Sequence, residues 1–174
     1  LNELDLRNLM YTGYAAFNGP FVIRYPRGKG EMKDWRNEMQ VLPIGKGKKL
    51  RDGDDIAVLS IGPIGNEVIK AIEMVKEEGV SIAHYDMIYL KPLDEELVHE
   101  IGRKYNRIIT VENGVIKGGF GSAVLEFMAD NGYTPHVKRI GVPDAFIEHG
   151  SIPELYQLCG MDAESIAKQL KKEN

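Results

Sequence analysis

The chain has 174 residues, of which 43% are hydrophobic and 28% are charged, and its formal net charge is −4. This composition is typical of one globular domain with a sizeable core, or of one domain plus a piece of another. The negative charge does not favour nucleic acid or an anionic membrane as a partner. Cys159 is the single cysteine, which excludes an internal disulfide. With no apolar run long enough to span a bilayer, we expect a cytoplasmic location.

The first part of the chain, residues 1–25, predicts one helix and one strand. Apolar residues fall on one face of a helix over residues 3–17, at Leu6, Leu9, Met10, Gly13 and Phe17. Phe21–Tyr25 is expected to form a short buried strand. One helix and one strand cannot cover both faces of a sheet, so we expect this unit to be a remnant that leaves apolar surface uncovered. Residues 26–46 are rich in Gly and Pro, and their length favours an interdomain linker.

From about residue 47 onward, strand and helix patterns alternate with short connections. Strands are expected at 56–61, 80–86, 107–111 and 136–140, and helices at 64–75, 95–104 and 121–130, followed by two short helices. Gly79 and Gly132 are placed to end helices, and Asp94 to begin one. This alternation predicts an α/β fold with a mostly parallel sheet covered on both faces.

The run Arg24-Tyr25-Pro26-Arg27-Gly28, called the arginine loop below, is a candidate phosphate site. An arginine presents a rigid fork of donors that matches phosphate oxygens, and a glycine lets the backbone come close. Ligands of open α/β sheets bind beyond the carboxyl ends of strands, where this run is expected to lie. The competing interpretation is a surface arginine that forms an ordinary ion pair.

Two further loops carry candidate residues. Glu112 ends a predicted strand, and Gly118 and Gly119 follow in a turn that either exposes N–H groups to an anion or packs closely against a neighbouring domain or subunit. Glu112 itself is either an acid/base group or a local cap. His149 lies in the loop 144–150 and either titrates or forms a structural hydrogen bond. No metal-ligand spacing, catalytic triad order or Walker loop is present, so the residues alone define no complete active site.

Five runs of the sequence occur together in one order. They are RYPRG (24–28), LPIGKG (42–47), KPLD (91–94), VENGVIKGGFGSAVLE (111–126) and VPDAFIEHG (142–150). In this order they closely resemble the C-terminal part of the 1-deoxy-D-xylulose-5-phosphate synthases, a family of transketolase-like thiamine diphosphate enzymes. KPLD is also similar to sequences in transketolases and in 2-oxo acid dehydrogenase β subunits, whereas the other runs are more specific to the synthases.

The resemblance implies a three-layer transketolase C-terminal domain over residues 47–174, preceded by a linker over 26–46 and by the last helix and strand of a pyrimidine-binding domain over 1–25. The family joins pyruvate to glyceraldehyde 3-phosphate, releases CO2 and supplies isoprenoid and thiamine synthesis. It uses thiamine diphosphate and Mg2+ and works as a homodimer.

By the same resemblance, Arg27, together with Tyr25, is expected to bind the phosphate of the aldehyde. The family's diphosphate- and magnesium-binding domain and its catalytic glutamate lie upstream, so this segment is expected to hold no cofactor or metal and to be inactive alone. The alternatives are the corresponding domain of a transketolase or of a 2-oxo acid dehydrogenase β subunit, and a non-catalytic interaction module.

Overall fold

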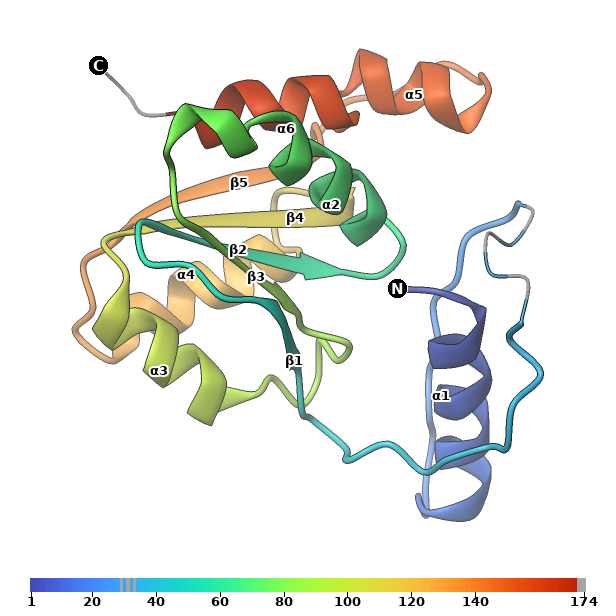
Figure 1. The fold of residues 1–174 in the computed structure, drawn as a ribbon. Coiled ribbons are helices and arrows are strands. Elements are labelled where there is room, and N and C mark those ends of the chain that lie inside the picture. Colours follow the sequence, from blue (N-terminus) through green and yellow to red (C-terminus); the bar gives the residue numbers. More distant parts are fainter. Residues whose placement is uncertain (29, 31, 33, 172–174) are drawn as a thin grey trace.

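The computed structural model describes residues 1–28, 30, 32 and 34–171 (Figure 1). The helices are α1 (Glu3–Ala15), α2 (Gly65–Met74), α3 (Glu95–Lys104), α4 (Phe120–Asp130), α5 (Ile152–Leu158) and α6 (Ala163–Leu170), with one 3-10 turn, η1 (Lys76–Glu78). The strands are β1 (Lys48–Arg51), β2 (Ile56–Ile61), β3 (Ile82–Asp86), β4 (Arg107–Val115) and β5 (His136–Val142).

The strands form one five-stranded mixed sheet in the order β1-β3-β2-β4-β5. β3, β2, β4 and β5 are parallel, and only β1 runs antiparallel, against β3. The predicted mostly parallel sheet is therefore confirmed. β1 was not predicted from the sequence, because its four residues, KKLR, carry three positive charges and one apolar side chain. A short, charged strand of this kind is typical of a sheet edge.

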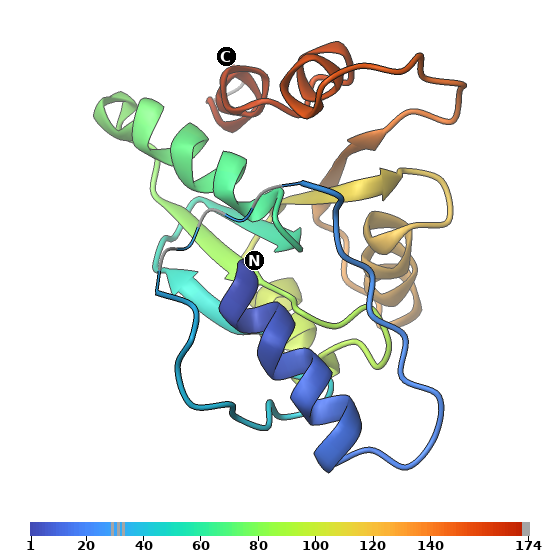
Figure 2. The same cartoon turned by 90° about the vertical axis from the view of Figure 1, so that its right-hand side faces the viewer.

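Helices cover both faces of the sheet, as the alternation of strands and helices predicts. α2 and α6 pack on one face, and α3 and α4 on the other (Figures 1 and 2). In β2, Ile56 and Val58 point into the first core, whereas Ala57 and Leu59 point into the second. A strand buried on both faces reads as a continuous apolar run, which is why β2 was recognisable.

The predicted helix signals are confirmed where the structure tests them. The side chain of Asp94 accepts a hydrogen bond from the backbone N–H of Leu97, 3.2 Å away, at the start of α3. Gly79 and Gly132 follow helical segments and both have φ of 71°. Only glycine adopts this left-handed conformation without strain, so both helices end where the sequence indicates.

The prediction of a buried strand at Phe21–Tyr25 is wrong. These residues form no strand, and the side chain of Val22 is 92% exposed. A strand needs a neighbour that pairs with its backbone, and no described strand lies beside this segment. Two boundaries also differ from prediction: α1 ends at Ala15 rather than at residue 17, and β4 continues through Glu112 to Val115 with an irregular register instead of ending at residue 111.

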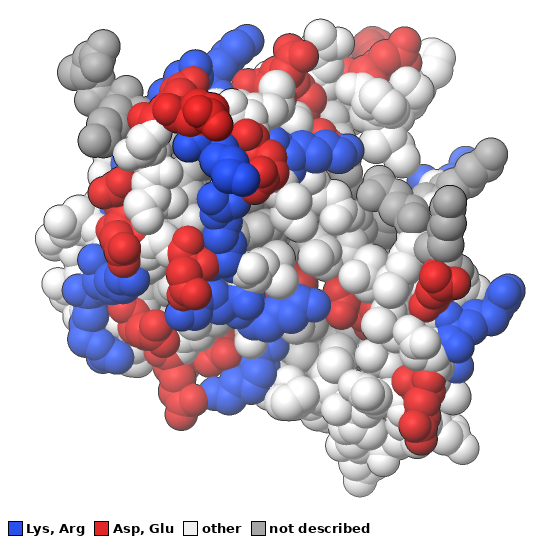
Figure 3. All heavy atoms as spheres, in the orientation of Figure 1, with Lys and Arg blue, Asp and Glu red and all other residues white. Residues whose placement is uncertain are grey.

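As expected, part of the apolar stripe of α1 is uncovered, and the buried side of the helix is a different one. The buried residues of α1 are polar: Asp5, Asn8 and Thr12. Met10 is 61% exposed, and the lower end of α1 presents a largely uncharged surface (Figure 3). Leu9 is half-buried. Asp5, Asn8 and Thr12 form a polar stripe along α1. This side of the helix is polar because it packs against the backbone of the following segment rather than against another apolar face.

That following segment runs along α1 and is held by side chain to backbone hydrogen bonds. The side chain of Asn8 accepts from the N–H of Gln40, 3.0 Å away, and the hydroxyl of Thr12 accepts from the N–H of Leu42, 2.8 Å away. The same hydroxyl donates to the carbonyl oxygen of Asn8 at 2.7 Å. The segment expected to be a linker is thus fastened to α1, at least over its second half.

Candidate functional site

The loops that follow the parallel strands gather at one side of the molecule. The arrowheads of β2, β4 and β5 point toward the side on which α1 and the arginine loop lie (Figures 1 and 2). In open α/β sheets this carboxyl side is where ligands bind. The candidate residues predicted from the sequence therefore all belong to this side of the molecule.

The arginine loop presents its charged side chains to solvent. Arg24, Tyr25 and Arg27 are exposed, and Arg27 forms no hydrogen bond or ion pair with any residue that the structure describes. A Cβ atom placed on Gly28 would lie 3.5 Å from Cδ1 of Ile152, in the first turn of α5. The loop therefore passes beside the start of α5, with the guanidinium of Arg27 available for an anion.

Both flanks of the arginine loop are fastened to α1. Upstream, the ring of Phe21 lies against Gly13, where an added Cβ would come within 2.8 Å of the ring, and it packs edge-on against Tyr89 with a centroid distance of 6.4 Å. Downstream, the backbone N–H of Met32 donates to Oε2 of Glu3 at 2.9 Å. One helix therefore fixes the chain on either side of the candidate phosphate site.

Glu112 caps a helix. Its buried carboxylate accepts hydrogen bonds from the backbone N–H groups of Phe120, at 2.9 Å, and Gly121, at 2.8 Å, in the first turn of α4. A negative charge at a helix N-terminus satisfies donors that have no partner within the helix. These two N–H groups are consequently occupied and do not point toward a ligand.

Gly118 and Gly119 are required by the shape of the same loop. A Cβ on Gly119 would lie 2.3 Å from Oε2 of Glu112 and 2.4 Å from the carbonyl oxygen of Val115, so the loop closes onto the carboxylate. Gly118 has φ of 70°, and its N–H donates to the hydroxyl of Ser122 at 3.0 Å. The two glycines thus serve packing within this loop.

His149 is exposed in the segment between β5 and α5, and it forms no hydrogen bond with any described residue. Phe146, in the same segment, is also fully exposed. The segment is tied to the Glu112 loop by an ion pair between Lys117 and Asp144, 3.1 Å apart. The structure therefore brings His149 to the carboxyl side of the sheet without assigning it a partner.

Three buried polar residues were missed from the sequence. Oγ of Ser60, in β2, lies 2.8 Å from Nε2 of His84, in β3, and burial lowers the pKa of His84 to about 4. Asp86 is completely buried, which raises the pKa of its carboxyl group. The signal was available: each of the three is a polar residue at an inward position of an otherwise apolar strand.

Asp86 takes part in a charged contact between the sheet and α1. Nζ of Lys48, in β1, lies 3.7 Å from Oδ2 of Asp86 and 3.2 Å from Oδ1 of Asp5. Lys48 therefore bridges carboxylates of two elements that are distant in sequence. This bridge holds the N-terminal half of α1 over the carboxyl end of β3.

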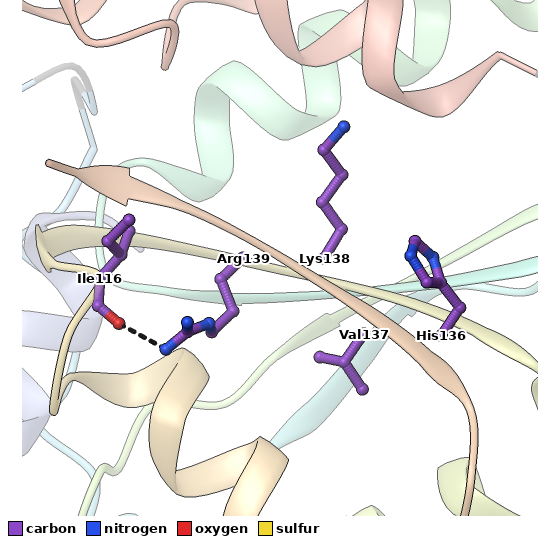
Figure 4. A pocket seen from close by; sticks show the side chains of 5 residues that line it. All are labelled: Ile116, His136, Val137, Lys138 and Arg139. Atoms are coloured by element: carbon purple, nitrogen blue, oxygen red, sulfur yellow. Dashed lines mark hydrogen bonds between the residues drawn. The ribbon is translucent and has the colours of Figure 1, made fainter.

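A cavity of about 450 Å³ lies along β5 and is also lined by Ile116 of the Glu112 loop (Figure 4). Successive side chains of the strand line it from opposite faces: Lys138 and His136 project to one face, and Arg139 and Val137 to the other. The guanidinium of Arg139 is held by the carbonyl oxygen of Ile116 and the hydroxyl of Ser122, each 2.8 Å away. The polar groups of this cavity do not converge on one point.

Residues 1–28, 30, 32 and 34–171 bring together no group of three or more His, Cys, Asp or Glu side chains suited to a metal ion. Over the same residues, no helix combines the length and apolar character needed to cross a membrane.

The mixed sheet, the helices on both faces and the loops gathered at the carboxyl ends define a transketolase-type C-terminal domain. Residues 45–166 match the family described as "Transketolase, C-terminal domain", and the chain belongs to this family. Over its whole length it is 98% identical to 1-deoxy-D-xylulose-5-phosphate synthase of Parabacteroides distasonis, and it is 60% identical to the synthase of Bacteroides thetaiotaomicron. The chain spans 28% and 27% of the lengths of these two relatives.

Solved structures agree with this assignment. A chain described as "Split gene transketolase, inactive beta4 tetramer" is 31% identical and superposes with a TM-score of 0.67, covering 76% of this chain and 45% of its own length. Transketolase from Campylobacter jejuni is 13% identical, with a TM-score of 0.54 over 72% of this chain and 18% of its own length. At that identity, the second likeness supports the fold alone.

Proposed function

We propose that the chain is the C-terminal part of a 1-deoxy-D-xylulose-5-phosphate synthase, which condenses pyruvate with glyceraldehyde 3-phosphate to give 1-deoxy-D-xylulose 5-phosphate and CO2. The two synthases compared above carry this name, and the 98% identity to the first extends over the whole chain. In this proposal residues 1–25 complete a pyrimidine-binding domain, 26–46 are the linker, and 47–174 are the C-terminal domain. The enzyme is a cytoplasmic homodimer that serves isoprenoid and thiamine synthesis.

We propose that the task of this chain is recognition of the aldehyde's phosphate. The observation that carries this task is the exposed, unpaired guanidinium of Arg27 in a loop that is anchored on both flanks. A phosphate dianion would accept two parallel hydrogen bonds from it, and the hydroxyl of Tyr25, two residues away, would supply a third donor. Binding the phosphate at a fixed point positions the aldehyde carbon of the same molecule for carbon–carbon bond formation.

Thiamine diphosphate and Mg2+ would be held by residues outside this chain. The described residues hold no cluster of three or more carboxylate, His or Cys side chains suited to a metal ion, and the N–H groups that open α4 are occupied by Glu112. We therefore expect the segment to be inactive alone. The split transketolase chain described as inactive, which is 31% identical, supports this expectation.

The alternatives are less well supported. A transketolase or a 2-oxo acid dehydrogenase β subunit would share the fold, but the likeness to the solved transketolases is 31% and 13%, against 98% to a synthase. A free-standing interaction module would need a covered α1, and Met10 and Tyr14 of α1 are 61% and 88% exposed.

The proposal is tested in the full-length protein by measuring CO2 release from pyruvate with and without glyceraldehyde 3-phosphate. Arg27→Ala should lower kcat/KM for the aldehyde by an amount equivalent to about 2–4 kcal/mol, because charge-assisted hydrogen bonds to the phosphate are lost. Arg24→Ala is the matched control, since Arg24 is an exposed arginine of the same loop. Use of a ketose phosphate donor in place of pyruvate would identify a transketolase and overturn the proposal.

A further inference from the structure

The flanks of the arginine loop are fastened near opposite ends of α1. The upstream anchor, Phe21, packs on Gly13, and the downstream anchor, Met32, is bonded to Glu3. Ten residues of helix separate Gly13 from Glu3, which corresponds to about 15 Å. Because α1 is rigid, it fixes the distance between its two contacts with the flanks of the arginine loop, at Gly13 and at Glu3.

Of the two anchors, the one bonded to Glu3 is nearer to Arg27 in the sequence. Oε2 of Glu3 accepts the backbone N–H of Met32 at 2.9 Å. A Cβ placed on Gly30 would lie 2.2 Å from Oε1 and 2.8 Å from Cγ of Glu3, so the main chain at Gly30 rests directly on the carboxylate. A larger residue at this position would displace the carboxylate, and the position comes three residues after Arg27.

We propose that Glu3 is a positioning residue for the phosphate subsite. By holding the backbone at Gly30 and Met32, it fixes the downstream end of the arginine loop and with it the direction in which Arg27 presents its guanidinium. This inference rests on the proposed function and extends it to a residue on a different element, 24 positions before Arg27 in the sequence. Glu3 does not touch the substrate in this account; it acts through Arg27.

A purely structural role for Glu3 predicts different results. An acidic residue in the first turn of a helix favours that helix through its dipole, and its loss would affect all substrates alike. A positioning role instead concerns the phosphate. The discriminating comparison is therefore between glyceraldehyde 3-phosphate and glyceraldehyde, which share the reacting carbonyl but differ in the group that Arg27 would bind.

The experiment uses the full-length protein with Glu3→Ala, Glu3→Gln and the control Glu38→Ala, because Glu38 is an exposed acidic residue without a partner among the described residues. Glu3→Ala should raise KM for glyceraldehyde 3-phosphate about 3- to 10-fold, the equivalent of one hydrogen bond, and leave kcat and the use of glyceraldehyde unchanged. Glu3→Gln keeps an acceptor for Met32 and should restore most of the loss. In an Arg27→Ala background, Glu3→Ala should have no further effect on KM.

Hydrogen exchange provides a readout that does not depend on activity. Glu3→Ala should increase exchange in peptides covering residues 21–28, whereas Glu38→Ala should not. Unchanged exchange in Glu3→Ala overturns the inference, as does an equal loss with both aldehydes or a full additional loss in the Arg27→Ala background. If the wild-type protein does not use pyruvate with the phosphorylated aldehyde, the proposed function fails. The exchange comparison then still decides whether Glu3 holds the loop.

Discussion

Replacing Glu112 should strongly destabilise the start of α4. The carboxylate is 5% exposed and accepts two backbone hydrogen bonds, at 2.9 and 2.8 Å. Hydrogen bonds to a charged group contribute about 1.5–3 kcal/mol each, and removing the acceptor leaves both buried donors unsatisfied. Glu112→Ala should therefore lower the free energy of unfolding by about 3–6 kcal/mol.

Glu112→Gln should cost about half as much. The amide oxygen can accept one of the two N–H groups, but the amide nitrogen is itself a donor and faces the other. The measurement is urea unfolding followed by circular dichroism, with linear extrapolation to water. Glu126→Ala, on the exposed side of the same helix, is the control and should lie within about 0.5 kcal/mol of the wild type. A loss below about 1 kcal/mol in Glu112→Ala would refute the assignment of the carboxylate as a cap.

Two further measurements address the buried polar groups. Because burial lowers the pKa of His84 from 6.5 to about 4, the unfolded chain binds a proton in this interval that the folded chain does not. Stability should therefore fall by about 3 kcal/mol as the pH drops from about 6.5 to about 4, and His84→Gln should flatten this slope in pH-dependent denaturation. The comparison is best made with Asp86→Asn present, since burial raises the pKa of Asp86 and its titration has the opposite slope; an unchanged slope in His84→Gln would contradict the reasoning. Thr12→Val removes the acceptor for the N–H of Leu42 and should cost about 1–3 kcal/mol by urea unfolding, whereas Thr12→Ser should retain most of the stability; equal losses would show that the hydroxyl is not needed.

The sequence was sufficient where local signals and tertiary structure agree. β2 reads as a continuous apolar run because both of its faces are covered, and Gly79 and Gly132 mark helix ends because their φ of 71° suits glycine. Asp94 was recognisable as a cap because its side chain bonds within its own turn, three residues on. In each case the structure is determined by residues close together in the sequence, or by the regular alternation of strands and helices.

The sequence was insufficient where a contact joins distant segments. The helical spacing of apolar residues did not reveal which side of α1 is buried, because the partners of Asn8 and Thr12 are main-chain groups more than 25 residues away. Phe21–Tyr25 has the composition of a strand but no described strand to pair with. For the candidate site, the motif identified Arg27, whereas its support by Glu3 depends on a backbone donor that no side-chain pattern reveals.

The polar stripe on α1 has a consequence for how this region tolerates change. Asn8 and Thr12 bind the N–H groups of Gln40 and Leu42, while residues 36–41 are exposed. These two contacts of α1 are made with main-chain groups of the segment, and they do not depend on which side chains the segment carries. Random mutagenesis of residues 36–41 should accordingly recover a wide range of folded variants. Proline at position 40 should be absent from the folded variants, because proline lacks the N–H group on which the attachment depends.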